Sequence, residues 1–148
     1  DFNARLMKTI REQKGYTYGI YGGMKRLRAG GNYVVEFSTD GDKAADAILE
    51  TLHIINESLN EGVTQEELEL VRLGNKNGFA NIFSSNASIH RVIGALFVAD
   101  YPKDHLNHTL NRLDNATINS VNTALNLRIK PDEFIIITVG KTKPNLGK

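Results

Sequence analysis

The chain has 148 residues, which suits one domain and is long enough to bury roughly two thirds of its unfolded surface. Hydrophobic residues make up 41% and charged residues 24% of the sequence, and 18 Lys and Arg against 17 Asp and Glu leave a net charge of +1. This balance argues against nucleic acid or an anionic membrane surface as the main partner, and no apolar stretch is long enough for a membrane span.

The sequence contains no cysteine. Disulfides, thiolate zinc sites and cysteine nucleophiles are therefore excluded, although this absence does not fix the compartment. The chain starts at Asp1 without an initiator methionine or a signal peptide, so we expect a mature product or an excised piece of a longer protein. We expect a soluble protein, and the sequence leaves the cytoplasm and the periplasm both open.

A helix is expected at the start of the chain, because apolar residues recur there at helical spacing: Phe2, Leu6 and Ile10. Asp1 or Asn3 can cap its first turn, and Gly15 ends it.

A β-hairpin is expected next. Residues 16–21 are rich in aromatic and β-branched side chains, which predicts a strand, and residues 32–39 predict a second strand. The second strand has apolar side chains on one face: Tyr33, Val35 and Phe37. Gly30 and Gly31 lie between the strands and suit a hairpin turn, because glycine tolerates positive φ angles.

A long amphipathic helix is predicted over residues 42–61. Its apolar stripe recurs at steps of three and four residues: Ala45, Ile48, Leu49, Leu52, Ile55 and Leu59. Gly62 sits where a left-handed C-terminal cap belongs. Thr64 and Glu67 then form a capping box, which predicts a second helix that continues beyond Phe79.

The last third of the sequence predicts three more helices and a strand. Helices are expected over residues 86–100, around residues 106–113 and over residues 118–127. The almost unbroken apolar run Phe134–Val139 predicts a strand that is covered on both faces.

The order of these elements predicts the fold class. A helix, two strands, about four helices and one strand indicate an α+β fold, with a small, mainly antiparallel sheet and helices layered on one face. We expect residues 1–148 to form a single domain. Three strands make a thin sheet, so either a strand is missed or more chain precedes Asp1.

The sequence offers no metal site. Four histidines are scattered along it, in neither an H-E-x-x-H nor an H-x-x-E-H motif: His53, His90, His105 and His108. Only His105 and His108 share a helix face, and without a third ligand we interpret both as surface residues. We therefore expect no catalytic residue, metal or cofactor in this chain.

One segment, Leu6–Gly19, is distinctive. It resembles the opening of the C-terminal, catalytically inactive domain of pitrilysin/insulinase peptidases, where a helix ends L-R-E-x-x-G and a strand begins L-x-Y. Ile10 and Tyr16 stand here in place of the two leucines. Further segments resemble the family in the same order: Phe37–Thr39, Ile48–Leu52, Gly62–Leu68 and Pro131–Gly140. The likeness covers nearly the whole chain.

The resemblance implies a half-domain of the pitrilysin and mitochondrial processing peptidase type. In this family an N-terminal domain carries the zinc motif and faces the C-terminal domain across the peptide. Zinc is therefore expected in an N-terminal domain or a partner chain. A peptide substrate is expected as a further partner, and the resemblance also implies a homo- or heterodimer. The family's domain also has strands before the position of Asp1, so we expect this chain to be truncated at its N-terminus.

Two residues carry the expected site. The resemblance implies that Arg11 and Tyr18 donate hydrogen bonds to the substrate backbone near the scissile bond and stabilise the tetrahedral intermediate. The plainer interpretation is that Arg11 complements the helix dipole and Tyr18 belongs to the core or the sheet surface. Four cations nearby are interpreted as a solvated hairpin rim, with the lining of an acidic-substrate chamber as the alternative: Lys14, Lys25, Arg26 and Arg28.

The function expected is that of the non-catalytic, substrate-binding domain of a zinc metalloendopeptidase, inert by itself. One alternative is a non-catalytic partner subunit of a two-chain peptidase. The other is a purely structural or assembly domain of the same fold.

Overall fold

The computed structural model describes residues 2–27 and 30–147. It divides into two compact units, one made of Asp1–Gly62 and Asn122–Lys148 and the other of Val63–Val121. Helices and a two-stranded antiparallel sheet make the chain α+β, which confirms the predicted fold class. The assignment of 1–148 to one domain stays a prediction, since compact units also occur within domains.

The first unit begins with helix α1 (Phe2–Leu6), which continues directly into the π-helical segment η1 (Met7–Gln13). The predicted helix is confirmed, although its period did not indicate the wider π-helical turns. Asn3 does not cap the helix; it lies within α1, and its Oδ1 accepts a hydrogen bond from the Gly22 N–H at 2.8 Å. The alternative cap, Asp1, lies outside the described residues.

The predicted hairpin is confirmed as strands β1 (Thr17–Leu27) and β2 (Gly30–Thr39), which pair antiparallel. The predicted turn at Gly30 and Gly31 is wrong, because both glycines lie in β2 and pair with the end of β1. The first strand therefore runs well past Tyr21, and residues 28 and 29 between the strands lie outside the described part of the chain.

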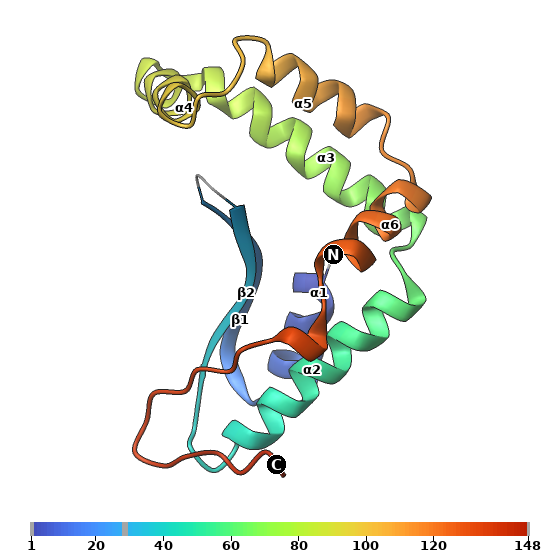
Figure 1. Ribbon diagram of the computed structural model, residues 1–148, viewed down its shortest axis with the longest axis vertical. Helices are drawn as coiled ribbons and strands as arrows, with labels where there is room; N and C mark the ends of the chain where they lie inside the picture. Colours follow the sequence, from blue (N-terminus) through green and yellow to red (C-terminus); the bar gives the residue numbers. More distant parts are fainter. Residues whose placement is uncertain (1, 28–29, 148) are drawn as a thin grey trace. The chain divides into compact units, whose positions relative to one another are not determined.

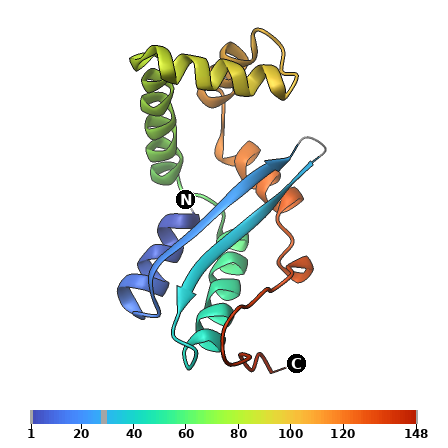
Figure 2. The same ribbon diagram turned by 90° about the vertical axis from the view of Figure 1, so that its left-hand side faces the viewer.

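One face of the hairpin packs against helices. The side chains of Tyr33, Val35 and Phe37 contact the core, as predicted, and the facing residue of β1 is the fully buried Ile20. Helices α1 and α2 lie on this same side of the sheet (Figures 1 and 2). The buried core consists of apolar side chains from α1, η1, β1 and α2, together with one residue near the C-terminal end of the chain: Leu6, Ile10, Ile20, Ile54, Ile55, Leu59 and Ile129.

Helix α2 (Ala44–Glu61) confirms the predicted long helix, and Ile55 and Leu59 are buried as predicted, but the other buried positions differ from the predicted stripe. Leu49 is 47% exposed, whereas the buried positions are Ala47, Thr51, Ile54, Ile55, Ser58 and Leu59. The helix carries apolar side chains on two sides. The spacing of apolar residues therefore does not predict which side faces the core. Gly62 follows it with φ +76° and ψ −175°, a conformation reserved for glycine, though not the predicted left-handed helical cap.

The strand predicted over Phe134–Val139 is wrong. These residues follow the short 3₁₀ helix η3 (Pro131–Glu133) but pair with no strand, and within the described residues the sheet contains β1 and β2 alone. Ile135, Ile137 and Val139 are 87%, 84% and 100% exposed, while Ile136 is 42% exposed. The alternation is that of an extended strand, but a ladder needs a neighbouring strand to supply its hydrogen bonds.

The second unit is helical. It contains α3 (Gln65–Asn81), the 3₁₀ turn η2 (Ile82–Ser84), α4 (Asn86–Val98), α5 (His105–Asp114) and the start of α6 (Ile118–Arg128). The Thr64–Glu67 capping box is confirmed in both directions, with N···O distances of 3.2 and 2.9 Å. Helices α3 and α5 lie side by side (Figure 1). No helix in the described ranges is long and apolar enough to cross a membrane.

Candidate substrate-binding site

Arg11 lies near the C-terminal end of η1, on the exposed side of that segment. The residue before it, Ile10, is fully buried in the core and fixes the rotation of the helix at this point. Gly15 ends the helix with φ +61°, and its N–H donates to the Arg11 carbonyl at 3.1 Å. Such π-helical turns are rare and often occur at functional sites.

Tyr18 lies at the start of β1, where the pairing with β2 is interrupted. Thr17 pairs with Thr39 and Ile20 pairs with Phe37, so two residues of β1 face one residue of β2. This arrangement is a β-bulge, which re-aims side chains locally and is common next to active sites. The Tyr18 side chain is 99% exposed, and the core interpretation of this residue is therefore wrong.

Neither candidate side chain is engaged elsewhere in the described part of the chain. Over residues 2–27 and 30–147, Arg11 and Tyr18 have no hydrogen-bond or ion-pair partner for their side chains. The turn Lys14–Tyr16 is all that separates η1 from β1, so the structure brings the two residues to the adjoining ends of two consecutive elements. A guanidinium and a phenol are both hydrogen-bond donors, and here both face solvent.

Thr17 is a residue of this site that sequence reasoning missed. Its side chain is 9% exposed, and its Oγ1 lies 3.1 Å from the Gly19 N, 2.6 Å from the Ser38 O and 2.8 Å from the Gly19 O. The only sequence signal is a threonine two residues before a glycine, the spacing of a local side-chain turn. That signal is too common to single out Thr17.

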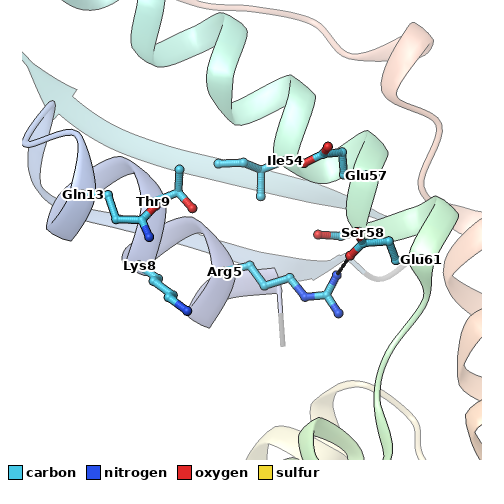
Figure 3. A pocket seen from close by; sticks show the side chains of 8 residues that line it. All are labelled: Arg5, Lys8, Thr9, Gln13, Ile54, Glu57, Ser58 and Glu61. Atoms are coloured by element: carbon cyan, nitrogen blue, oxygen red, sulfur yellow. Dashed lines mark hydrogen bonds and ion pairs between the residues drawn. The ribbon is translucent and has the colours of Figure 1, made fainter.

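The helix that carries Arg11 is anchored to α2. Arg5 donates from Nη1 to the Glu61 Oε2 at 3.2 Å and from Nη2 to the Gly62 carbonyl at 2.9 Å. A cation at the carbonyl end of α2 also complements that helix's dipole. Beside this contact lies a hollow of about 230 Å³ with a mixed polar lining, in which Arg5 reaches across to Glu61 (Figure 3). Arg11 does not line this hollow.

Two of the cations considered for a substrate chamber are already paired. The Lys14 Nζ lies 3.1 Å from the Glu50 carboxylate, and the hydrogen bond that the ammonium donates to this carboxylate raises the pKa of Lys14 above its ordinary value. The Lys25 Nζ lies 2.6 Å from the Glu36 carboxylate on the neighbouring strand. These pairs favour the solvated hairpin rim. Nothing is described for the Arg26 side chain, and Arg28 lies outside the described residues.

The described residues do not fit a zinc site. No three His, Asp or Glu side chains gather within the described ranges. His108 contacts the Asp104 carboxylate at 2.9 Å, and the ring of His105 lies 4.0 Å from that of Tyr101. His53 lies 3.3 Å from Glu57 on its own helix. These contacts agree with surface histidines.

A family model described as the peptidase M16 inactive domain matches residues 1–75, the part that holds Arg11, Thr17 and Tyr18. The match confirms the resemblance drawn from the segment Leu6–Gly19. A search of curated proteins finds no match.

Solved structures agree with the family match. The peptidase M16 inactive domain from Pseudomonas fluorescens is 26% identical over 87% of this chain, with a TM-score of 0.78, and this chain spans 31% of its length. The periplasmic protease PqqL from Escherichia coli is 17% identical over 84% of this chain, with a TM-score of 0.72, and this chain covers 14% of its length. A predicted zinc protease from Bordetella pertussis Tohama I is 17% identical over 82% of this chain, with a TM-score of 0.65, and this chain covers 67% of its length. The last two show likeness of fold alone.

Proposed function

We propose, because this chain belongs to the peptidase M16 inactive-domain family, that it is the substrate-binding domain of a zinc metalloendopeptidase. Its partners in this role are a peptide and a zinc-bearing N-terminal domain or partner chain. In this role the zinc ligands lie on that domain or partner chain, and this chain binds and orients the peptide with Arg11 and Tyr18.

The observation that carries the proposal is the exposure, on well-anchored backbone, of two donors that have no partner among the described residues. Tyr18 is 99% exposed on a strand whose next inward-facing residue, Ile20, is fully buried. A fully exposed phenol keeps its O–H free to donate to a ligand. Arg11 follows the fully buried Ile10 in the same way. Donors on rigid elements are what a binding site requires.

The two donors suit the chemistry of peptide hydrolysis. Hydrolysis of a peptide bond places negative charge on the former carbonyl oxygen. A phenol O–H and a guanidinium directed at that oxygen stabilise the charge as it develops, and one such donor contributes roughly 3 kcal/mol. The guanidinium can also bind a peptide carbonyl before reaction, because it presents several donors in a fixed plane.

The test uses the intact peptidase that contains this domain, or this chain together with its zinc-bearing partner. Arg11→Ala and Tyr18→Phe should each lower kcat/KM by roughly one to two orders of magnitude. Zinc content and the unfolding midpoint should not change. Matched controls are Lys8→Ala on the same helix and Tyr21→Phe on the same strand, both exposed positions that should retain activity.

Unchanged activity in both site variants would overturn the proposal and favour a structural or assembly role. A loss in the Lys8 and Tyr21 controls equal to that in the site variants would also overturn it, because the effect would then not be specific to the two donors. A zinc motif encoded upstream of Asp1 would indicate a self-sufficient peptidase, and its absence would indicate a partner subunit.

A further inference from the structure

We propose that Thr17 is a positioning residue whose buried hydroxyl holds the β1 bulge in the geometry that presents Tyr18. The inference rests on the proposed function in so far as Tyr18 binds substrate. It adds a residue that does not touch the peptide but decides where the Tyr18 hydroxyl lies.

The bulge itself creates the need for such a residue. Between the Thr17–Thr39 and Ile20–Phe37 pairs, Tyr18 and Gly19 together face only Ser38. Two residues against one leave backbone groups of the longer strand without regular ladder partners. The backbone on both sides of Tyr18 is thus the part of β1 that the ladder constrains least.

The Thr17 hydroxyl supplies what the ladder lacks. Its oxygen accepts a hydrogen bond from the Gly19 N–H at 3.1 Å, which closes a short loop around Tyr18. Its single proton donates to the Ser38 carbonyl at 2.6 Å or to the Gly19 carbonyl at 2.8 Å. One buried side chain therefore links the two ends of the bulge to each other and to β2.

A hydrogen bond from β2 also holds the backbone just before the bulge. The Thr39 Oγ1 donates to the Tyr16 carbonyl at 2.6 Å, so the residue before Thr17 is held as well. Tyr18 is then the one side chain in this stretch that projects freely, with fixed backbone before and after it. Loss of the bulge would shift the pairing by one residue and move side chains to the other face of the sheet.

Removal of the hydroxyl should act on the chemical step. Thr17→Val keeps the shape of the side chain but leaves a Gly19 N–H and a Ser38 carbonyl without this partner. A displacement of the Tyr18 phenol by an ångström costs transition-state stabilisation, so we expect kcat to fall roughly tenfold in the intact peptidase while KM changes less than about twofold. Thr17→Ser keeps the hydroxyl and should retain most of the activity.

A double-mutant cycle with Tyr18→Phe separates positioning from general loss of stability. If Thr17 acts through Tyr18, Thr17→Val should have almost no further effect on kcat in the Tyr18→Phe background. Thr51→Val is the matched control, because Thr51 is 6% exposed in α2 and also donates to a backbone carbonyl, at 2.7 Å. It should lower thermal stability to a similar degree without changing kcat.

Hydrogen exchange gives a readout that does not depend on activity. Thr17→Val should speed exchange of the Gly19 amide, and Thr17→Ser should not. Unchanged protection of Gly19 in Thr17→Val would overturn the inference whatever Tyr18 does, and so would full additivity with Tyr18→Phe or an equal loss in Thr17→Ser. A wild-type rate for Tyr18→Phe together with faster Gly19 exchange would instead remove Tyr18 from the proposed function and leave the structural role of Thr17 supported.

Discussion

The two compact units of this chain are stabilised by different means. The first unit has a core shared by helix and strand side chains, among which Leu6, Ile10, Ile20 and Ile55 are fully buried. In the described part of the second unit, Leu68 is the only large apolar side chain that is buried. Its helices nevertheless carry many exposed apolar side chains: Leu70, Leu73, Phe83, Ile93, Phe97 and Val98.

The second unit depends instead on caps and charged contacts. The Arg72 guanidinium donates to the Leu113 and Ala116 carbonyls at 3.1 and 2.7 Å, and the Lys76 ammonium pairs with the Asp114 carboxylate. Hydrogen bonds of this kind contribute about 1 kcal/mol each, whereas a buried aliphatic side chain contributes about twice that. The difference indicates that the first unit provides the rigid support a binding site needs.

The largest expected effect tests the core directly. Ile55→Ala in the first unit should lower the free energy of unfolding by about 2–5 kcal/mol, because a fully buried side chain leaves a cavity. Ile93→Ala in the second unit, where the side chain is 51% exposed, should cost less than about 1 kcal/mol. Urea unfolding of both variants measures the difference. Equal losses would contradict the comparison and show that α4 is covered in solution.

The next effect concerns the polar contacts of the second unit. Arg72→Ala removes the guanidinium that donates hydrogen bonds to two backbone carbonyls near the end of α5. The free energy of unfolding should fall by about 1–3 kcal/mol. Amide exchange in α5 should become faster at the same time. The control is Arg112→Ala, an exposed arginine on α5 itself. If Arg112→Ala has the same effect, the carbonyl contacts of Arg72 do not hold α5.

A smaller effect is expected at the start of α3. Thr64→Ala removes the hydroxyl that accepts from the Glu67 N–H and should cost about 1 kcal/mol. Thr64→Ser keeps the oxygen and should be nearly neutral. Circular dichroism during thermal unfolding compares the two variants, and an equal loss in Thr64→Ser would show that the cap is not responsible.

The smallest effect concerns the exposed ion pair of the first unit. The Glu50 carboxylate raises the pKa of Lys14, so the pair contributes stability below the unfolded pKa of about 10.5 and loses it as the pH rises through the folded pKa. Glu50→Gln should lower the Lys14 pKa toward its ordinary value, as measured by NMR titration of the Lys14 side chain. An unchanged Lys14 pKa would show that the contact with Glu50 does not persist in solution.

The parts of the fold that were predicted correctly depend on local sequence. The capping box at Thr64 and Glu67 sets the start of α3, and the apolar spacing that ends at Leu59 sets the extent of α2. The strand predicted over Phe134–Val139 was wrong for the opposite reason. An apolar β-branched run shows that a segment suits a sheet, but the neighbouring strand it needs is not a local property.

The site was predictable only in part. The resemblance to a family predicts that Arg11 and Tyr18 form the site. Residue type alone does not distinguish them from other surface arginines and tyrosines. The exposure of Tyr18 depends on a bulge, and the setting of Arg11 depends on π-helical turns. Neither feature leaves a clear period in the sequence, because a bulge inserts one residue and a π-turn changes the hydrogen-bond step locally. Thr17 could be recognised only once its neighbours across the sheet were known.

The run Phe134–Val139, which is exposed from Ile135 onward, also affects how this chain behaves at high concentration. Six apolar or β-branched residues without charge, proline or glycine are the type of segment that assembles into cross-β aggregates. Charged residues stand on both sides of it, Asp132 and Glu133 before and Lys141 and Lys143 after, and all four are exposed. Flanking charges of this kind oppose stacking of like chains. The run is suited to pairing with a strand, and it can pair with other copies of itself wherever a partner strand is lacking. The four flanking charges oppose that self-association.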